Sequence, residues 1–286
     1  MRVPCIYNLD SIVRRSLEED RVQRDVTTQR LVGASDVSRA RIMFKEKAVV
    51  CGLAIAKRVF QELDKNVRCD FLCSEGKEVK KNTTVLVVRG KTRAILAGER
   101  TALNFLGYLS GIATNARRYV RAVSSCKVTI LDTRKTTPGL RELEKYAVRC
   151  AGAHNHRSNL EDLILVKDNH RSACRCMTVA EIVQRLRRGK KKAIEFEADT
   201  LSQFKQALKA GVDIILLDNM SCAQMNKAVA LRNQMGNRGR PLLEASGGIT
   251  LKNIKQAART GVDRISVGAL THSRKSIDVS MEIIEE

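Results

Sequence analysis

The sequence predicts an α/β protein in which repeated βα units form a parallel sheet, preceded by a separate α+β region. From residue 128 onward, short aliphatic runs alternate with amphipathic helical stretches, as in folds whose helices pack around a parallel sheet. The phrases Gly211-Val212-Asp213 and Gly261-Val262-Asp263 repeat the same helix end and strand start fifty residues apart. Hydrophobic residues make up 43% of the chain but aromatic residues only 3%, so we expect an aliphatic core typical of packed α/β layers.

Six aliphatic runs are the strand candidates of this sheet. They span residues 128–131, 163–166, 194–197, 214–217, 242–245 and 264–267. One intervening helix is expected over 201–211 and another over 251–261, with the hydroxyls of Thr200 and Thr250 as their N-terminal caps. A third helix is expected over 178–188. The order of elements is that of a barrel-like parallel sheet.

The first 105 or so residues predict a different kind of structure. A helical stretch over 11–20 comes before short strands at 41–44, 48–50 and 85–88, and glycines between them indicate turns. This pattern predicts an α+β domain with an antiparallel sheet. A helix over 98–109 is expected to connect it to the parallel sheet, because no linker rich in Pro, Gly or Ser separates the two parts.

The sequence has no feature of a membrane-spanning or secreted protein. Its aliphatic runs are far shorter than the roughly 20 residues that a spanning helix needs, and the first twenty residues carry charges instead of an apolar targeting core. We therefore expect a cytoplasmic protein whose nine scattered cysteines are free thiols. Cys174 and Cys176, with His170 nearby, lack the spacing of a zinc site and are interpreted as loop thiols.

The chain is strongly basic, with 52 Lys and Arg against 31 Asp and Glu and a formal charge of +21. This balance makes a polyanion a candidate partner. However, the basic residues are spread along the whole length, the aromatic residues are too few for a base-stacking platform, and no zinc-finger or ribonucleoprotein motif occurs. Nucleic acid is therefore not an expected partner.

Polar side chains follow each of the six predicted strands. They are Asp132 to Lys135, Lys167 and Asp168, Glu195 and Glu197, Asp218 and Asn219, Glu244 to Gly248, and Gly268. The carboxyl ends of parallel strands meet at one rim, where polar residues usually face a ligand. Because Arg134, Lys135, Arg157 and Lys167 are cationic, the sequence predicts an anion-binding site at this rim.

Six motifs occur in order along most of the chain, which from Asp25-Val26-Thr27-Thr28 to His272 resembles a known family. The motifs are Asp132-Thr133-Arg134-Lys135-Thr136-Thr137-Pro138-Gly139, Asn155-His156-Arg157, Lys167-Asp168-Asn169-His170, Leu217-Asp218-Asn219-Met220, Glu244-Ala245-Ser246-Gly247-Gly248-Ile249 and Ser266-Val267-Gly268-Ala269-Leu270-Thr271-His272. Together they resemble quinolinate phosphoribosyltransferase, also called nicotinate-nucleotide pyrophosphorylase (carboxylating), and six ordered motifs are far more specific than one.

The resemblance implies an incomplete, six-stranded α/β barrel with an N-terminal α+β open-faced sandwich domain. The sandwich domain would span residues 1–107 and be joined by the C-terminal tail 273–286, and the barrel would span 108–272. The implied reaction transfers a phosphoribosyl group from phosphoribosyl pyrophosphate to quinolinate, with loss of carbon dioxide and pyrophosphate, to give nicotinate mononucleotide for NAD synthesis. Magnesium would be the cofactor.

The resemblance also implies the binding residues. Arg134, His156, Arg157 and Lys167 would line the quinolinate pocket, Lys135 would lie nearer the phosphates, and Arg100 would reach in from a neighbouring subunit of a homodimer or larger assembly. The backbone N–H groups of the phosphate loop, aided by a helix start near Thr250, would bind the 5′-phosphate. These N–H groups belong to Ser246, Gly247, Gly248 and Gly268, here called the phosphate loop. His272 is the remaining implied binding residue.

Catalytic roles are implied for two carboxylates and two lysines. Glu197 and Asp218 would hold the metal and the ribose hydroxyls, and would stabilise positive charge at the anomeric carbon. Lys135 and Lys167 are candidate proton donors after decarboxylation. His154 is interpreted as a spacer and His170 as a supporting residue outside this set.

Three alternatives stay open on the residues alone. Lys167 at a strand end suits a Schiff-base enzyme of the aldolase type. The excess positive charge suits a polyanion-binding protein. A phosphoribosyltransferase acting on nicotinate itself is nearer, but the number of cations favours a substrate with two carboxylates.

Overall fold

The computed structural model describes residues 6, 8–189, 192–235 and 240–284. The chain forms two compact units, one made of Met1–Arg117, Thr137–Gly152 and Ser273–Glu286, the other of Arg118–Thr136 and Ala153–His272. Within the described ranges, no helix combines the length and the apolar character that crossing a membrane requires.

The first unit is built on an antiparallel sheet, as predicted. Its strand order is β12 (Val279–Ile284), β1 (Val37–Phe44), β5 (Thr83–Lys91) and β3 (Arg68–Phe71), and every pairing is antiparallel. The short strands β2 (Ala48–Val49) and β4 (Glu78–Val79) form a second, two-stranded sheet. The end of the chain is thus an edge strand of the first unit, with Val279 opposite Phe44.

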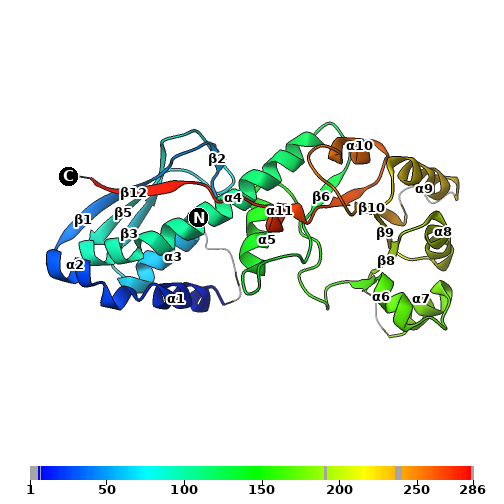
Figure 1. Ribbon diagram of the computed structural model, residues 1–286, viewed down its shortest axis with the longest axis horizontal. Helices are drawn as coiled ribbons and strands as arrows, with labels where there is room; N and C mark the ends of the chain where they lie inside the picture. Colours follow the sequence, from blue (N-terminus) through cyan, green and yellow to red (C-terminus); the bar gives the residue numbers. More distant parts are fainter. Residues whose placement is uncertain (1–5, 7, 190–191, 236–239, 285–286) are drawn as a thin grey trace. The chain divides into compact units, whose positions relative to one another are not determined.

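Helices cover one side of this sheet and leave the other open (Figure 1). The helices of this unit are α1 (Leu9–Glu19), η1 (Val22–Arg24), α2 (Val26–Leu31), α3 (Leu53–Leu63), the first part of α4 (Thr92–Ala122) and α5 (Arg141–Cys150), which lies apart from the sheet. The Asp25 side chain accepts hydrogen bonds from the backbone N–H groups of Thr27 and Thr28, at 3.1 and 2.9 Å, and so caps α2. This capping explains why the Asp25-Val26-Thr27-Thr28 motif begins a helix.

Helix α4 is much longer than the helix predicted over 98–109, with 31 residues. The apolar periodicity continues on both sides of that window, because Ile95, Ile112 and Ala116 are all fully buried. Gly107 is tolerated inside the helix for a packing reason, since a Cβ there would lie 2.6 Å from the carbonyl oxygen of Ile277 in the C-terminal tail.

The second unit contains the predicted six-stranded parallel sheet. The strands are β6 (Thr129–Leu131), β7 (Ile164–Val166), β8 (Ile194–Ala198), β9 (Ile214–Asp218), β10 (Leu242–Ser246) and β11 (Arg264–Ser266). Their order is β6-β11-β10-β9-β8-β7 and all five pairings are parallel. The edge strands β6 and β7 are not neighbours in this order, so the sheet is an incomplete barrel.

Short helices follow the strands of this unit. They are α6 (Asp168–Ala173), α7 (Val179–Arg187), α8 (Leu201–Ala210), α9 (Cys222–Gln234), α10 (Ile254–Arg259) and α11 (Ala269–His272). Thr200 caps α8 as predicted, since its hydroxyl accepts from the Gln203 N–H at 3.2 Å. In Figure 1, α7, α8 and α9 lie along the outer side of β8 and β9.

The prediction that Thr250 caps a helix from residue 251 is wrong. Helix α10 begins only at Ile254 and is six residues long. The side chain of Asn253 accepts from the Thr250 N–H at 2.8 Å and donates to the Gly248 carbonyl at 2.9 Å. These bonds hold residues 250–253 in a turn, so the helix starts later than its apolar pattern indicates.

The internal repeat seen in the sequence has a physical role. Asp213 accepts from the Ile194 N–H at the start of β8 (2.8 Å) and pairs with Arg187 of the preceding helix (3.2 Å). Asp263 accepts from the Leu243 N–H in β10 at 2.7 Å and pairs with Arg232 of α9. Each aspartate therefore links the start of its own strand to the start of the neighbouring strand. This role explains why the sequence Gly-Val-Asp occurs twice.

Candidate active site

His156 lies against two buried carboxylates inside the second unit. Its Nε2 atom is 3.1 Å from Oε2 of Glu195 in β8 and 3.4 Å from Oε1 of Glu244 in β10. Both glutamates are 0% exposed. Burial lowers the pKa of His156, but the hydrogen bonds and charges of the two carboxylates outweigh it and raise the pKa to about 9. The site thus favours a cationic imidazole at neutral pH.

The His156 ring is oriented from the backbone side as well. Asp132, fully buried after β6, accepts from the His156 N–H at 2.8 Å and from the Asn155 side chain at 2.6 Å. In the neutral form of the ring, the Arg157 N–H donates to Nδ1 of His156 at 2.8 Å, so the ring proton is on Nε2, the nitrogen that faces the carboxylates. The Asn155-His156-Arg157 motif therefore works as one unit whose conformation depends on Asp132.

Two arginines lie beside this histidine. The guanidinium of Arg157 donates to the Leu163 carbonyl at 3.2 Å. The pKa of Arg157 is lowered, chiefly by burial and secondly by the positive charge of Arg134. Two guanidinium groups close enough to repel each other form a region that attracts a dianion.

Carboxylates gather at the ends of β8 and β9. Oxygen atoms of Glu197, Asp199 and Asp218 all lie within 4.8 Å of one another. Partial burial and the negative charges of the other two raise the pKa of Asp218. Carboxylate oxygens are the ligands that hard divalent cations prefer, so this carboxylate trio fits a magnesium ion.

Lys167 pairs with one member of the carboxylate trio. Its Nζ lies 3.2 Å from Oε2 of Glu197, at the ends of the neighbouring strands β7 and β8. His170 supports this lysine indirectly, because its Nδ1 accepts from the Lys167 N–H at 3.0 Å. The amine is thus engaged by a carboxylate and is not free to attack a carbonyl carbon, so the geometry does not favour the Schiff-base alternative.

Two glycines of the phosphate loop have a positive φ torsion angle. Gly247 has φ +84° and Gly248 has φ +61°. A Cβ on Gly247 would lie 2.2 Å from the Asn219 side chain, whereas one on Gly248 would meet no atom within 4 Å. Position 247 requires glycine because a side chain there would collide with Asn219 in the loop after β9. At Gly248 the missing side chain leaves the backbone open to a ligand.

Gly268, Lys135 and His272 lie together at the end of β11. A Cβ on Gly268 would lie 3.1 Å from the His272 imidazole and 3.2 Å from Cδ of Lys135. The Thr271 hydroxyl donates to the Lys135 carbonyl at 2.7 Å and fixes the loop after β6 against the last helix of the unit. A lysine beside a glycine-lined backbone suits binding of phosphate oxygens.

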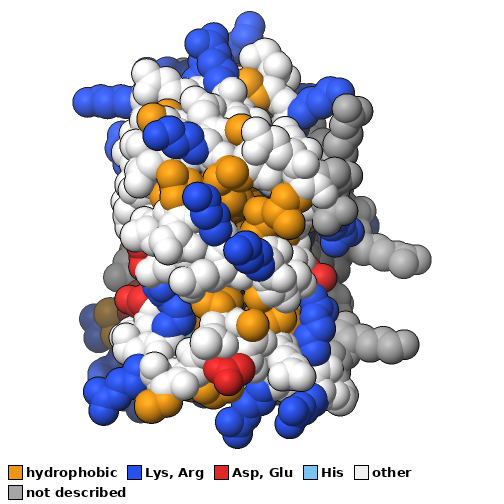
Figure 2. Space-filling model, turned by 90° about the vertical axis from the view of Figure 1, so that its right-hand side faces the viewer, with side chains coloured by type: hydrophobic (Ala, Val, Ile, Leu, Met, Phe, Trp, Pro, Cys, Tyr) orange, Lys and Arg blue, Asp and Glu red, His pale blue; other side chains and the backbone are white. Residues whose placement is uncertain are grey.

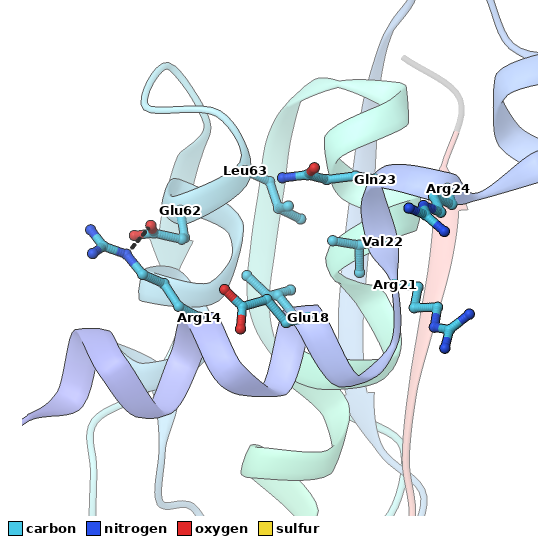
Figure 3. A pocket seen from close by; sticks show the side chains of 9 residues that line it. Arg14, Glu18, Arg21, Val22, Gln23, Arg24, Glu62 and Leu63 are labelled. Atoms are coloured by element: carbon cyan, nitrogen blue, oxygen red, sulfur yellow. Dashed lines mark hydrogen bonds and ion pairs between the residues drawn. The ribbon is translucent and has the colours of Figure 1, made fainter.

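Arg100 is the one predicted binding residue that belongs to the first unit. It is exposed on α4. An open hollow elsewhere in that unit, drawn in Figure 3, contains none of the predicted residues. There Arg14 pairs with Glu62 at 2.7 Å, and Arg21 and Arg24 lie nearby.

The basic residues do not form one concentrated patch on the face that Figure 2 shows. Lys and Arg side chains are scattered over it, with apolar side chains between them. This scattered distribution of basic side chains gives no support to the polyanion-binding alternative.

The cysteines of the described residues are all free thiols, as predicted, and Cys5 lies outside those residues.

Comparison with known proteins identifies the family. Residues 112–282 match the quinolinate phosphoribosyl transferase C-terminal domain, and residues 25–110 match the N-terminal domain of the same family. The chain belongs to the quinolinate phosphoribosyltransferase family. It is 43% identical over 280 residues to the probable nicotinate-nucleotide pyrophosphorylase (carboxylating) of Synechocystis, with 96% of this chain and 92% of that protein covered. The corresponding Bacillus subtilis protein is 39% identical over 275 residues, covering 96% of this chain and 93% of its own length.

A solved structure supports the same assignment. The nicotinate-nucleotide pyrophosphorylase from Francisella tularensis superposes with a TM-score of 0.91 and is 38% identical, with 98% of each chain covered. This quinolinate phosphoribosyltransferase-family chain therefore has the fold of a relative along almost its whole length.

Four side chains at the site of this quinolinate phosphoribosyltransferase-family chain were given no individual role by sequence reasoning. They are Asp132, Asp199, Glu195 and Glu244. Glu195 and Glu244 each stand between apolar neighbours in a strand, and a carboxylate at such a position is a signal of a buried partner. Asp199 directly follows β8, where it could have been recognised as a third strand-end carboxylate.

Proposed function

We propose that this chain transfers the phosphoribosyl group of phosphoribosyl pyrophosphate to the ring nitrogen of quinolinate and releases pyrophosphate and carbon dioxide. The product is nicotinate mononucleotide, in the de novo synthesis of NAD. One observation carries the proposal. Lys167, one of the predicted cations for a diacid, lies 3.2 Å from Glu197, which belongs to a carboxylate trio that suits a metal-bound sugar phosphate.

The cationic region would bind quinolinate. The two neighbouring carboxylates of quinolinate need several positive groups; the guanidinium groups of Arg134 and Arg157 would supply the donors, and His156 would add positive charge. The raised pKa of His156 supports this role, since the ring then carries charge at neutral pH. Lys167 would reach the substrate from the other side of the site.

The carboxylate trio would bind the ribose and the metal. Glu197, Asp199 and Asp218 would hold a magnesium ion, which supplies charge neutralisation for the departing pyrophosphate. Glu197 and Asp218 would also accept hydrogen bonds from ribose hydroxyls. The N–H groups of Gly247, Gly248 and Gly268 would receive the 5′-phosphate, with Lys135 beside them.

The residues of the site would act in two stages. As the bond to pyrophosphate weakens, positive charge grows at the anomeric carbon, and the negative field of Glu197 and Asp218 stabilises it while the pyridine nitrogen attacks. The carboxylate beside the new pyridinium is then lost as carbon dioxide, and the electron pair left on the ring carbon accepts a proton. Lys135 and Lys167 are the candidate donors of that proton.

The assembly belongs to the proposal too. We expect at least a homodimer in the cytoplasm, in which Arg100 of one subunit adds a guanidinium to the quinolinate site of its neighbour. Its exposure on α4 supports this role, since an arginine free at the surface is accessible to a second subunit.

A product assay tests the function. Purified protein is incubated with quinolinate, phosphoribosyl pyrophosphate and magnesium, and nicotinate mononucleotide is measured by chromatography. Nicotinate is the comparison substrate, and a reaction without magnesium is the control for the metal. We expect product from quinolinate at a rate far above that from nicotinate. Equal turnover of both pyridines, or none of either, would contradict the proposal.

A further inference from the structure

A cluster of reactive side chains lies in the first unit, apart from the residues of the proposed reaction. Cys51 stands between β2 and α3, Glu75 in the turn between β3 and β4, and Cys150 is the last residue of α5. Their sulfur and carboxylate oxygen atoms all lie within 4.8 Å of one another. Tyr146, one turn earlier on α5, is hydrogen-bonded to both Glu75 and Cys150.

The backbone around the two cysteines is held firmly. A Cβ on Gly76 would lie 2.7 Å from the Cys150 carbonyl oxygen, so this glycine lets the Glu75 turn pack directly on the end of α5. The Arg117 guanidinium donates to the carbonyls of Gly76 at 3.0 Å and Cys150 at 3.3 Å. The Ser110 hydroxyl accepts from the Cys51 N–H at 2.9 Å. The sulfur pair is therefore part of a packed, hydrogen-bonded structure.

The two thiols differ in character. Cys51 is 0% exposed, and burial raises the pKa of its thiol well above the usual range. Cys150 is only partly buried, and its pKa is lowered, chiefly because the Cys51 thiol donates a hydrogen bond to its sulfur and Tyr146 donates another. Cys150 is thus the better nucleophile, and Cys51 is a protonated thiol at its side.

Glu75 argues against a metal as the occupant of this cluster. Its Oε2 accepts from the Gly52 N–H at 2.8 Å and its Oε1 from the Ala54 N–H at 3.4 Å. Both oxygens therefore cap the start of α3, and a tetrahedral zinc ion would have to displace these bonds.

We propose that Cys51 and Cys150 are a redox-active dithiol that a hydroperoxide converts into an intramolecular disulfide. The Cys150 thiolate attacks the peroxide oxygen, the O–O bond breaks, and the sulfur is oxidised to a sulfenic acid while the peroxide is reduced to water or an alcohol. The Cys51 sulfur then attacks the sulfenic sulfur and water leaves. In sum, two thiols and one hydrogen peroxide give one disulfide and two water molecules.

Two other partly buried cysteines, Cys69 and Cys73, lack this arrangement. Burial raises the pKa of Cys69 to about 12 and also raises that of Cys73, and neither thiol has a neighbouring cysteine among its charge partners. Cys69 is therefore a matched control for a partly buried thiol without a partner. We expect Cys150 to react with hydrogen peroxide at least about tenfold faster than Cys69, because it has far more thiolate at neutral pH.

The test is a peptide map of the full chain after brief exposure to hydrogen peroxide and alkylation of the remaining thiols. We expect a peptide pair joined through Cys51 and Cys150, two hydrogens lighter than the reduced pair and restored by dithiothreitol. The C51S variant should stop at a Cys150 sulfenic acid that dimedone traps, and the Y146F variant should slow oxidation of Cys150. The C69S variant should form the cross-link at the wild-type rate.

Three results would overturn the inference. One is that Cys51 and Cys150 stay reduced in the wild-type map while Cys174 and Cys176 are oxidised. Another is a cross-link of either residue to a different cysteine. The third is that one equivalent of zinc per chain protects both thiols from alkylation, which would make the cluster a metal site. None of these results depends on turnover of quinolinate, so the oxidation test and the product assay can fail independently of each other.

Discussion

The Nε2 atom of His156 lies 3.1 Å from Oε2 of Glu195, and both side chains are buried in the second unit. The second carboxylate, from Glu244, is paired at 3.0 Å with Arg264 of the next strand. The arrangement places two positive and two negative groups in contact in the interior. Such clusters are stable only when every charge keeps its partner, so changing one member is expected to alter the others.

The E195Q variant should lower the pKa of His156 toward its ordinary value of 6.5. In the wild type, the raised pKa adds stability that is fully present below pH 6.5 and is lost as the pH rises through about 9. In that window, one proton changes the free energy of unfolding by up to about 1.4 kcal/mol per pH unit. Denaturant unfolding from pH 6 to 10 should show a weaker pH dependence in E195Q than in the wild type. The control is E161Q, at an exposed glutamate of the same unit.

The K167A variant should lose turnover because it removes a charged donor from between the two parts of the site. Deleting one charged hydrogen bond costs about 1.5–3 kcal/mol, or roughly one to two powers of ten in kcat/KM for quinolinate. Steady-state kinetics with each substrate varied in turn would measure the loss. K205A, at an exposed lysine on α8, is the matched control and should behave as the wild type. Equal kinetics for the two variants would remove Lys167 from the site.

Substitution of the paired glycines should separate packing from ligand binding. G247A places a methyl group 2.2 Å from Asn219 and should lower both the melting temperature and the activity. The added methyl group of G248A would have no atom within 4 Å, and the same holds for G211A, the control, at the C-cap of α8 with φ +71°. These two should lose similar stability, about 1–2 kcal/mol for a left-handed alanine, yet only G248A should raise KM for phosphoribosyl pyrophosphate. Unchanged KM in G248A would contradict a phosphate site there.

The D218N variant should gain stability and lose function. The pKa of Asp218 is raised in the folded state by burial and by Glu197 and Asp199, so at pH 7 its ionised form opposes folding. Replacing it by a neutral amide should therefore raise the melting temperature of the metal-free protein. Magnesium should stabilise the wild type against heat but not D218N, and the variant should have little activity. A melting temperature that magnesium raises equally in both proteins would argue against Asp218 as a ligand.

The strand positions could be predicted from the sequence because the strands of the second unit are rich in buried aliphatic residues. Ile214 to Leu217, for example, are all buried, and a short aliphatic run just after the glycine that ends α8 is typical of a strand. The strand-end residues Lys167, Glu197 and Asp218 could be placed at one rim for the same reason. Their closeness follows from parallel pairing of adjacent strands.

The pairing inside the sheet could not be predicted in the same way. Glu195 and Glu244 come from strands separated by β9, and their meeting at His156 depends on curvature of the sheet, which no local pattern encodes. The late start of α10 was missed because the bonds of Asn253 compete with the helix, and apolar periodicity does not register such side-chain bonds. The closeness of Cys51 and Cys150, a hundred residues apart, likewise arises only from tertiary packing.

The last strand of the chain has a consequence for biosynthesis. β1 is made early in translation, but its partner β12 lies more than two hundred residues later, with Phe44 opposite Val279. Until β12 has been made, the growing polypeptide carries an open edge on β1, and edges of this kind invite association with other chains. A truncated polypeptide that lacks β12 would leave that edge open, and it would be prone to aggregate although it keeps most of the fold's residues.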